Sequence, residues 1–409
     1  MKNQWTGGQY SLYRYLFGLY LFIHFFHLLP WTHELFSNQG MIPDKTLSPL
    51  IHLFPNMLAL SDQPEVTAMM ALSGMLAALF FMIGKWDKLS AGILWYLLAC
   101  FLGRNPLIAN PSLPFVGWLL LAHLFLPQSP YGSLSARNRI DPRGNWEMPR
   151  SIFLASWCVM AIAYTYSGFL KLSSPSWIDG TAFIHLLQNP LARCNGLPEI
   201  LSDLPLVLLK SLTWGALALE IGFVFFALFN PVRLWIWSAM LLMHVGLLCL
   251  IDFADLSLGM IFFHFFTFNP GWVKAREGTL VVYYDGSCGF CHSFIRFILS
   301  ENVQRKGFRF APLQEHFAPS LIPNSIVVKE KDQLYHKSTA IFRVLTSLGG
   351  IWRVLAWVLS LLPRRLCDAI YDLIARIRHK IFSKPKDLCP LIPEDLRKYF
   401  QREESILGP

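Results

Sequence analysis

Long apolar runs separated by short polar breaks fill the first two thirds of the chain. Eight runs are candidate membrane spans, because about 20 apolar residues in a helix cross roughly 30 Å of hydrocarbon. They cover residues 11–30, 66–84, 89–103, 113–127, 151–171, 205–229, 233–250 and 256–269. Several are short enough to be half-spans or re-entrant segments, so about five to nine full spans is the expected range. From residue 271 onward charged residues are much more frequent. The pattern predicts a mainly α protein, with a polytopic helical membrane domain over 1–270 and a small domain over 271–409.

Composition supports a membrane location. Of the 409 residues, 54% are hydrophobic and 15% are charged, whereas a soluble domain carries about 25% charged residues. The net charge of +9 fits basic loops retained on the cytoplasmic side. It does not indicate a nucleic-acid partner, because no basic stripe is interleaved with aromatic residues in a soluble sheet. The first apolar run is too long for a signal peptide and lacks a small-residue cleavage site. The expected partner is the lipid bilayer.

The loops predict an orientation. The basic loops fall on one side of the predicted membrane domain: Lys85, Lys88, Arg137, Arg139, Arg143, Arg150, Arg233, Lys274 and Arg276. The other side receives the acidic stretch 31–65, the long loop 172–204 and the link 251–255. Since the basic side is cytoplasmic, eight spans place both termini in the cytoplasm. An odd number of spans would place the C-terminal domain outside.

The C-terminal domain opens on a strand pattern. Residues 279–285 form a β-branched and aromatic run, and Gly286 follows as a turn residue. Cys288 and Cys291 then open a stretch in which Phe290, Phe294, Phe297 and Ile298 follow helical spacing. A strand, a tight turn and C-x-x-C at a helix start is the thioredoxin-like arrangement. We therefore expect a small α/β thioredoxin-like domain.

This placement suits dithiol chemistry. A helix N-terminus stabilises a thiolate, so Cys288 is the expected attacking thiol. Cys291 lies one turn further on and can resolve a mixed disulfide. Asp285 is a candidate to accept or relay a proton, although its charge opposes a nearby thiolate.

The cysteine pair has two other interpretations, a structural zinc site and a pair of inert buried thiols. Structural zinc requires four ligands, and the chain offers beside the pair only irregularly spaced His292, His316, Cys367 and Cys389, so no metal is expected. Buried inert cysteines are the second alternative. Cys100, Cys158 and Cys249 lie in apolar runs, where cysteine is usually a small packing residue.

Residues 284–291 resemble the signature of the DCC-type thiol–disulfide oxidoreductases. Further segments follow in the order of that family: 310–314, 325–328, 338–340, 348–352, 363–368, 371–376 and 389–390. The resemblance spans roughly 278–402 and implies a thioredoxin-like fold and thiol exchange with an unspecified thiol or disulfide partner. Cys389 matches a late cysteine of such proteins and is a candidate third redox thiol or a packing residue.

Residues 351–382 predict two amphipathic helices with interspersed basic residues. Ordinary packing within the domain is the first expectation. Docking onto the anionic cytoplasmic leaflet is the alternative.

Lys171 is the most informative residue of the membrane domain. A lysine near the end of a span is commonly a snorkelling anchor. The alternative is a desolvated lysine that acts as a base.

Residues 104–106, 168–171 and 177–180, with His185, Glu220 and His244, resemble the vitamin K-dependent γ-carboxylase (HTTM) membrane domain. The resemblance covers about 10–270. In the carboxylases the lysine that matches Lys171 is the base toward vitamin K hydroquinone, which makes Lys171 a candidate base here. The resemblance implies a helical bundle with a lipid or quinone pocket near the outer leaflet, and a quinone is the candidate cofactor. The large lumenal region of the carboxylases is absent, so carboxylation itself is not carried over. Intramembrane histidines are candidates for proton handling or for packing: His24, His27, His123, His244 and His264.

Three functions follow as hypotheses. The first is a multi-pass membrane thiol–disulfide oxidoreductase with Cys288 and Cys291 as catalytic residues. The second is a carboxylase-like membrane enzyme with an accessory redox domain. The third is a non-enzymatic membrane redox sensor or scaffold.

Overall fold

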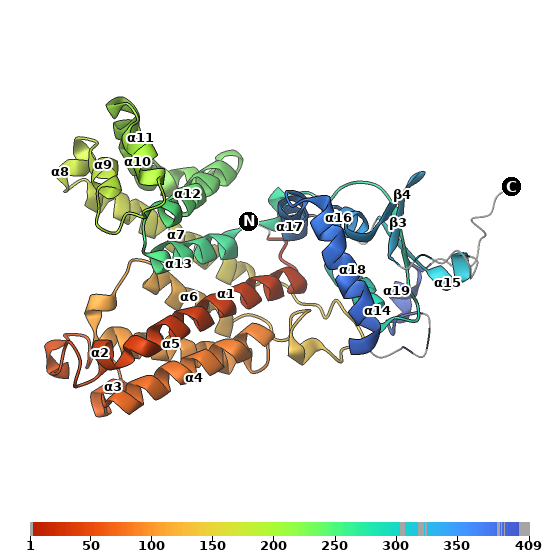
Figure 1. Cartoon of the computed structure of the whole chain (residues 1–409), viewed down its shortest axis with the longest axis horizontal. Helices are drawn as coiled ribbons and strands as arrows, with labels where there is room; N and C mark the ends of the chain where they lie inside the picture. Colours follow the sequence, from red (N-terminus) through yellow and green to blue (C-terminus); the bar gives the residue numbers. More distant parts are fainter. Residues whose placement is uncertain are drawn as a thin grey trace. The chain divides into compact units, whose positions relative to one another are not determined.

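The computed structural model describes residues 3–302, 307–317, 323, 325–382, 385, 387 and 389–400. The chain divides into two compact units. Figure 1 labels the helices and strands and colours the chain along its sequence. We call the first the helical unit; it comprises residues 13–126 and 149–268. The second, the redox unit, comprises the described parts of 2–12, 127–148 and 269–409. The redox unit therefore includes the predicted C-terminal domain and two earlier segments of the chain.

Each of the eight predicted apolar runs lies largely within a helix. The helices of this part of the chain are α1 (Gly7–Leu28), α2 (Thr32–Phe36), α3 (Met57–Leu60), α4 (Pro64–Ile83), α5 (Asp87–Arg104), α6 (Leu113–Leu124), α7 (Arg150–Lys171), α8 (Pro175–Ile178), α9 (Ala182–Leu187), α10 (Leu197–Ser202), α11 (Leu206–Leu228), α12 (Asn230–Leu250) and α13 (Ala254–Thr267). Short 3₁₀ turns lie at Leu29–Trp31, Lys45–Leu47, Pro106–Ile108, Leu134–Ala136 and Pro270–Trp272.

Among the described residues, five helices are long and apolar enough to cross a membrane. They are Gly7–Phe36, which joins α1 to α2, together with α4, α7, α11 and α12. Helices α6 and α13 have 12 and 14 residues, which at 1.5 Å per residue falls short of roughly 30 Å of hydrocarbon. The prediction of eight full spans is thus not confirmed. The five helices are compatible with membrane insertion.

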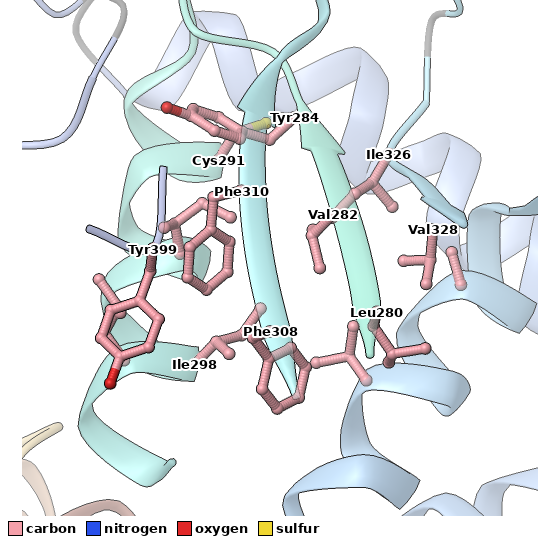
Figure 2. Packing of buried hydrophobic residues seen from close by; sticks show 14 of the residues in the cluster. Leu280, Val282, Tyr284, Cys291, Ile298, Phe308, Phe310, Ile326, Val328 and Tyr399 are labelled. Atoms are coloured by element: carbon pink, nitrogen blue, oxygen red, sulfur yellow. The ribbon is translucent and has the colours of Figure 1, made fainter. Parts of the chain in front are cut away.

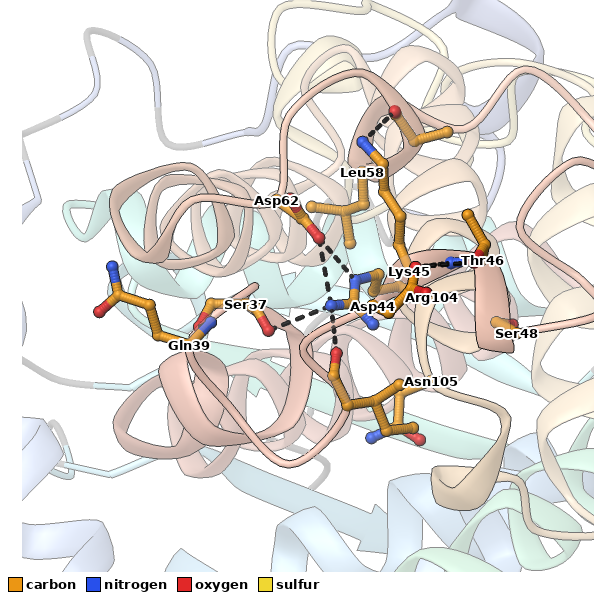
Figure 3. A network of polar contacts seen from close by, with 12 residues as sticks. Ser37, Gln39, Asp44, Lys45, Thr46, Ser48, Leu58, Asp62, Arg104 and Asn105 are labelled. Atoms are coloured by element: carbon orange, nitrogen blue, oxygen red, sulfur yellow. Dashed lines mark hydrogen bonds and ion pairs between the residues drawn. The ribbon is translucent and has the colours of Figure 1, made fainter.

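A buried arginine at the end of α5 fixes the connection between α2 and α4 (Figure 3). Arg104 is fully buried and forms an ion pair with Asp62 at 3.1 Å. Its Nη2 also donates to the carbonyl oxygens of Ser37 at 3.1 Å and Ile42 at 2.6 Å. Asn105 adds a hydrogen bond to the Leu35 carbonyl. These bonds satisfy a charge that would otherwise be costly to bury.

The redox unit is built on a mixed four-stranded sheet in the order β2-β1-β3-β4. Its strands are β1 (Leu280–Tyr284), β2 (Phe308–Pro312), β3 (Val327–Glu330) and β4 (Gln333–His336). Strand β1 runs parallel to β2 and antiparallel to β3, which continues into β4 as a hairpin. The parallel pair requires a crossover, and α14 (Gly289–Glu301) lies within that crossover. The predicted strand and helix around the cysteines are confirmed.

Alternation along β1 buries both faces of the sheet. Leu280, Val282 and Tyr284 share a core with Phe310 of β2 and Ile298 of α14 (Figure 2). On the opposite face Tyr283 packs with Ala311, Leu313 and Val327. The strand is therefore held from both sides, which fixes the position of the turn that follows Tyr284.

The remaining helices of the redox unit follow β2 and the hairpin. They are α15 (Leu313–His316), α16 (Lys337–Leu348), α17 (Gly350–Ser360), α18 (Arg364–Ile381) and α19 (Glu394–Arg397). Helices α17 and α18 match the two predicted amphipathic helices.

A buried carboxylate explains why the first residues of the chain belong to the redox unit. Glu301, the last residue of α14, is 2% exposed. It accepts hydrogen bonds from the Gly8 N–H at 2.9 Å, the Trp352 indole at 2.7 Å and the Thr6 hydroxyl. Burial raises the pKa of Glu301, and these hydrogen bonds oppose that rise. Glu301 thus joins the residues around the start of α1 and Trp352 of α17 to the end of α14.

Candidate dithiol site

Cys288 occupies the N-cap position of α14. The backbone turns after β1 through Gly286, whose N–H donates to Gln314 Oε1 at 3.0 Å. The Cys291 N–H then donates to the Cys288 sulfur at 3.4 Å. A sulfur at this position accepts from one of the free N–H groups at the helix start and faces the positive end of the helix dipole. Both cysteines are buried, at 2% and 7% exposed.

The two thiols differ in acidity. The pKa of Cys288 is lowered from 9.0 to about 6, mainly by the hydrogen bond from the Cys291 thiol. The Cys291 N–H and the Arg378 charge act in the same direction, while burial and Asp285 oppose them. The pKa of Cys291 is raised, first by its hydrogen bond to Cys288 and then by burial. The first thiol is thus the one that ionises near neutral pH.

Asp285 organises the turn. Its Oδ1 accepts from the Ser287 N–H at 2.9 Å, the Ser287 hydroxyl at 2.7 Å and the Gln314 amide at 2.7 Å. Burial alone would raise the pKa of Asp285, but these hydrogen bonds and the Arg378 charge lower it overall. The side chain is therefore an ionised acceptor at neutral pH.

Arg378 on α18 reaches both the carboxylate and a sulfur. Its Nη1 lies 3.5 Å from the Cys291 sulfur, and its Nη2 lies 3.4 Å from Asp285 Oδ2. From the sequence alone, Arg378 is expected only as one of the basic residues of an amphipathic helix. One signal was present: Arg378 follows Tyr371 by seven residues, so the two lie on the same helix face.

A cavity of about 210 Å³ adjoins the Cys291 side of the site. Its walls are almost entirely apolar and come from α14, the start of β3, α16 and α18: Phe290, Cys291, Phe294, Ile326, Ile341, Tyr371, Ile374, Ala375 and Arg378. The Tyr371 hydroxyl accepts from the Ile326 N–H at 2.8 Å. The cavity therefore suits an apolar group placed next to a reactive sulfur.

The other cysteines are also free thiols. Cys367 is buried and Cys389 is half-buried, and burial raises the pKa of Cys389. Among the residues that the structure describes, no group of three or more His, Cys, Asp or Glu side chains could hold a metal ion.

Lys171 lies in the helical unit and is paired with a carboxylate. Its Nζ is 2.5 Å from Glu220 of α11 and 4.6 Å from the centre of the Trp177 ring. Ser167 donates to the same carboxylate at 3.2 Å. The sequence singled out Lys171 and Glu220 separately, and the structure brings them together.

The predicted intramembrane histidines do not form one cluster. His244 and His264 both contact the Tyr164 hydroxyl, at 2.8 and 2.7 Å. His24 pairs with Asp255 at 2.9 Å, and His123 lies 3.3 Å from Asp87. His27 is exposed.

The fold and the site define the class of the redox unit: an α/β domain with an asymmetric pair of thiols at a helix N-terminus. The DCC1-like thiol-disulfide oxidoreductase family matches residues 282–384. The chain belongs to this family through its C-terminal part.

Three relatives show how far the similarity extends. The uncharacterized protein YuxK of Bacillus subtilis is 31% identical over 129 residues, covering 29% of this chain and 92% of the relative. A chloroplastic DCC family protein of Arabidopsis thaliana is 25% identical over 135 residues, covering 29% of this chain and 77% of the relative. The uncharacterized protein YitO of Bacillus subtilis is 32% identical over 111 residues, but these are 25% of this chain and 35% of that relative. No solved structure matches the chain. The similarity thus supports a redox role for the C-terminal part.

Proposed function

We propose that this protein is a membrane-anchored thiol–disulfide oxidoreductase in which Cys288 attacks and Cys291 resolves. The observation that carries the proposal is the Cys288 sulfur at the N-cap of α14, where it accepts the Cys291 N–H and has a pKa of about 6. A thiol that ionises below neutral pH is the nucleophile of disulfide exchange.

The exchange proceeds in two balanced steps. The Cys288 thiolate attacks one sulfur of a substrate disulfide, forms a mixed disulfide and releases the other sulfur as a thiolate. Cys291 then loses its proton and attacks the Cys288 sulfur, which releases the second substrate thiolate and leaves a Cys288–Cys291 disulfide. The substrate gains two electrons and the protein loses two. In the reverse direction the protein disulfide oxidises a dithiol.

Asp285 and Arg378 act as positioning residues in this scheme. Arg378 lies 3.5 Å from the Cys291 sulfur, so its charge stabilises the thiolate that forms in the resolving step. Asp285 holds Arg378 through an ion pair at 3.4 Å. Because its other oxygen is occupied by three donors, Asp285 serves as an anchor rather than as a proton relay.

The apolar helices of the helical unit support the membrane anchor. The basic loops favour a cytoplasmic redox unit, since such loops stay on the cytoplasmic side. Cytoplasmic thiols are kept reduced, so the reduced dithiol is the resting form under this proposal.

Replacing Cys288 tests the proposal. The full chain in detergent is assayed for reduction of a water-soluble model disulfide, with thiol-trapping mass spectrometry on the same samples. Cys288→Ser should abolish turnover, whereas Cys194→Ser, which removes an exposed thiol, should leave it unchanged. Undiminished turnover in Cys288→Ser would refute the proposal. Reversible oxidation of the wild-type pair without turnover would favour the sensor function.

A second candidate function concerns the helical unit and rests on the Lys171–Glu220 pair. The pair lies in a segment that resembles the γ-carboxylase (HTTM) membrane domain, and it is flanked by Trp177. We propose that this unit handles a quinone. A dithiol can reduce a quinone to a quinol with two electrons and two protons. Two incubations test the idea: one with an oxidised quinone, to follow quinol formation by the reduced protein, and one with a reduced quinone, with a mass-spectrometric search for products. Unchanged turnover in Lys171→Ala would exclude the lysine from such chemistry.

A further inference from the structure

Helix α17 presents an apolar stripe that no described part of the chain covers. Val354, Trp357, Val358 and Leu361 follow one another at helical spacing. Trp357 is 65% exposed and Leu361 is 68% exposed. Large apolar residues that are exposed at a helical period form one continuous face.

Helix α18 repeats the feature. Its exposed apolar residues are Leu366, Ile370, Leu373, Ile374 and Ile377. Their spacing again places them on one face. Leu361 and Leu362, both exposed, join the two stripes in the chain. We call these two stripes and their junction the α17–α18 surface.

The opposite faces of the helices hold them on the redox unit. Trp352 and Ala356 of α17 pack with Leu345 of α16. Tyr371 of α18 packs against the main core. The predicted packing of these helices within the domain therefore accounts for one face of each, and the outer apolar faces require another explanation.

Charge gives that explanation. Five exposed basic residues belong to these two helices: Arg353, Arg364, Arg365, Arg376 and Lys380. The only carboxylates in the sequence of these two helices belong to Asp368 and Asp372. Asp368 accepts from Ser338 and pairs with Arg364, and Asp372 pairs with Lys337 at 2.8 Å. The surface is thus apolar with a basic border whose acidic residues are already neutralised.

We propose that the α17–α18 surface docks onto the anionic surface of a lipid bilayer. An apolar stripe bordered by Lys and Arg is the composition of helices that lie in the membrane interface, and each basic residue adds attraction to anionic headgroups. A second copy of the chain fits less well, because a two-fold interface pairs this surface with itself, so one border rich in exposed basic residues would face another. The chain also carries apolar helices compatible with membrane insertion, which keeps this surface near a bilayer.

Hydrogen exchange of the full chain in lipid nanodiscs tests the docking. Samples in zwitterionic phosphatidylcholine are compared with samples rich in anionic phosphatidylglycerol, and exchange is followed in peptides from 350–381. Exchange should be slower in the anionic discs. The difference should shrink when salt is raised from about 0.15 M to 1 M, since the screening length falls from about 8 Å to 3 Å.

Matched variants separate the contribution of charge from that of apolar contact. Arg365→Gln should weaken docking about fivefold, and Trp357→Ser with Leu361→Ser should abolish it. The controls are Arg309→Gln and Leu391→Ser, which change an exposed charge and an exposed apolar residue of the redox unit outside this surface. All these positions are exposed, so the variants should keep the wild-type thermal midpoint.

Two outcomes would overturn the proposal. Equal exchange in both lipids would show that no anionic bilayer covers the surface. Protection that requires two chains per disc would make it an interface between copies. Reduction of a water-soluble disulfide, measured on the same samples, should be unchanged in all the surface variants, so a failure of docking is distinguishable from a failure of the dithiol proposal.

Discussion

Each unit of the protein contains a cation paired with a carboxylate, and the two pairs differ in what lies beside them. In the redox unit Arg378 pairs with Asp285 at 3.4 Å and also lies 3.5 Å from the Cys291 sulfur, at the wall of a cavity. In the helical unit Lys171 pairs with Glu220 at 2.5 Å under the ring of Trp177. The Arg378–Asp285 pair lies beside a reactive sulfur and a cavity. The Lys171–Glu220 pair lies beside an aromatic ring.

This difference shows how to assess buried charges as functional sites. A buried charge is costly unless it has a partner. An ion pair alone is therefore compatible with a structural role. A nucleophile within reach and space for a substrate group add the features of an active site. The redox unit has all three features. The Lys171–Glu220 pair shows the first, and the following experiments test whether the contrast between the two pairs holds.

The largest effect is expected for the resolving thiol. Cys291→Ser should lower turnover by orders of magnitude and trap a mixed disulfide on Cys288, because the second attack is lost. Mass spectrometry of the intact protein after exposure to a model disulfide detects the adduct. Cys288→Ser is the control and should form no adduct at this site; an equal adduct in that variant would reverse the assigned roles.

A loss of stability without a change in disulfide reduction is expected for the helical pair. Lys171→Met leaves Glu220, only 3% exposed, without its cation, and breaking a buried pair costs about 3–5 kcal/mol. Denaturant titration in detergent measures the loss, while reduction of a soluble disulfide should not change. Lys210→Met on α11 is the matched control. A loss of disulfide reduction in Lys171→Met at full stability would erase the contrast between the two pairs.

A smaller effect is expected for Arg378. Arg378→Met removes a positive charge next to the thiols, and such a charge lowers a pKa by about 1–3 units. The alkylation profile of Cys288 should shift to higher pH, and resolution of the mixed disulfide should slow at least about tenfold at neutral pH. Arg376→Met, two residues away and exposed, should change neither quantity. Unshifted alkylation in Arg378→Met would remove the arginine from the mechanism.

The last effect concerns stability against pH. The folded-state pKa of Cys288, about 6, lies below its ordinary value of 9.0, so ionisation stabilises the reduced protein. This contribution is fully present above the ordinary value and is lost as pH falls through about 6. The difference in unfolding free energy between the reduced wild type and Cys288→Ser should therefore decrease between pH 9 and pH 6. An increase over that range would contradict the assignment of the low pKa.

Local features of the site could be predicted from the sequence, and contacts between distant segments could not. Strand β1, the turn at Gly286 and the start of α14 are set by neighbouring residues, so pattern and turn chemistry located them. Arg378 is 87 residues from Cys291, and its place on the same helix face as Tyr371 does not by itself indicate that contact. Gln314 and Glu301 acquire their roles in the same way, through partners that are distant in the sequence.

The number of full spans could not be predicted for a different reason. The run 113–127 is apolar apart from His123, but α6 ends at Leu124, so an apolar run overestimates the length of its helix. Hydropathy reports which residues avoid water. It does not distinguish a residue that faces lipid from one that is buried by its neighbours, and the count of full spans depends on that distinction.

Ile374 belongs both to the wall of the cavity beside Cys291 and to the exposed stripe of α18. With that stripe on a bilayer, the entrance to the dithiol would open where lipid and water meet. The effective substrate concentration would then be a mole fraction in the membrane. Turnover would rise with the partition coefficient of the disulfide and fall when inert lipid is added at constant bulk concentration.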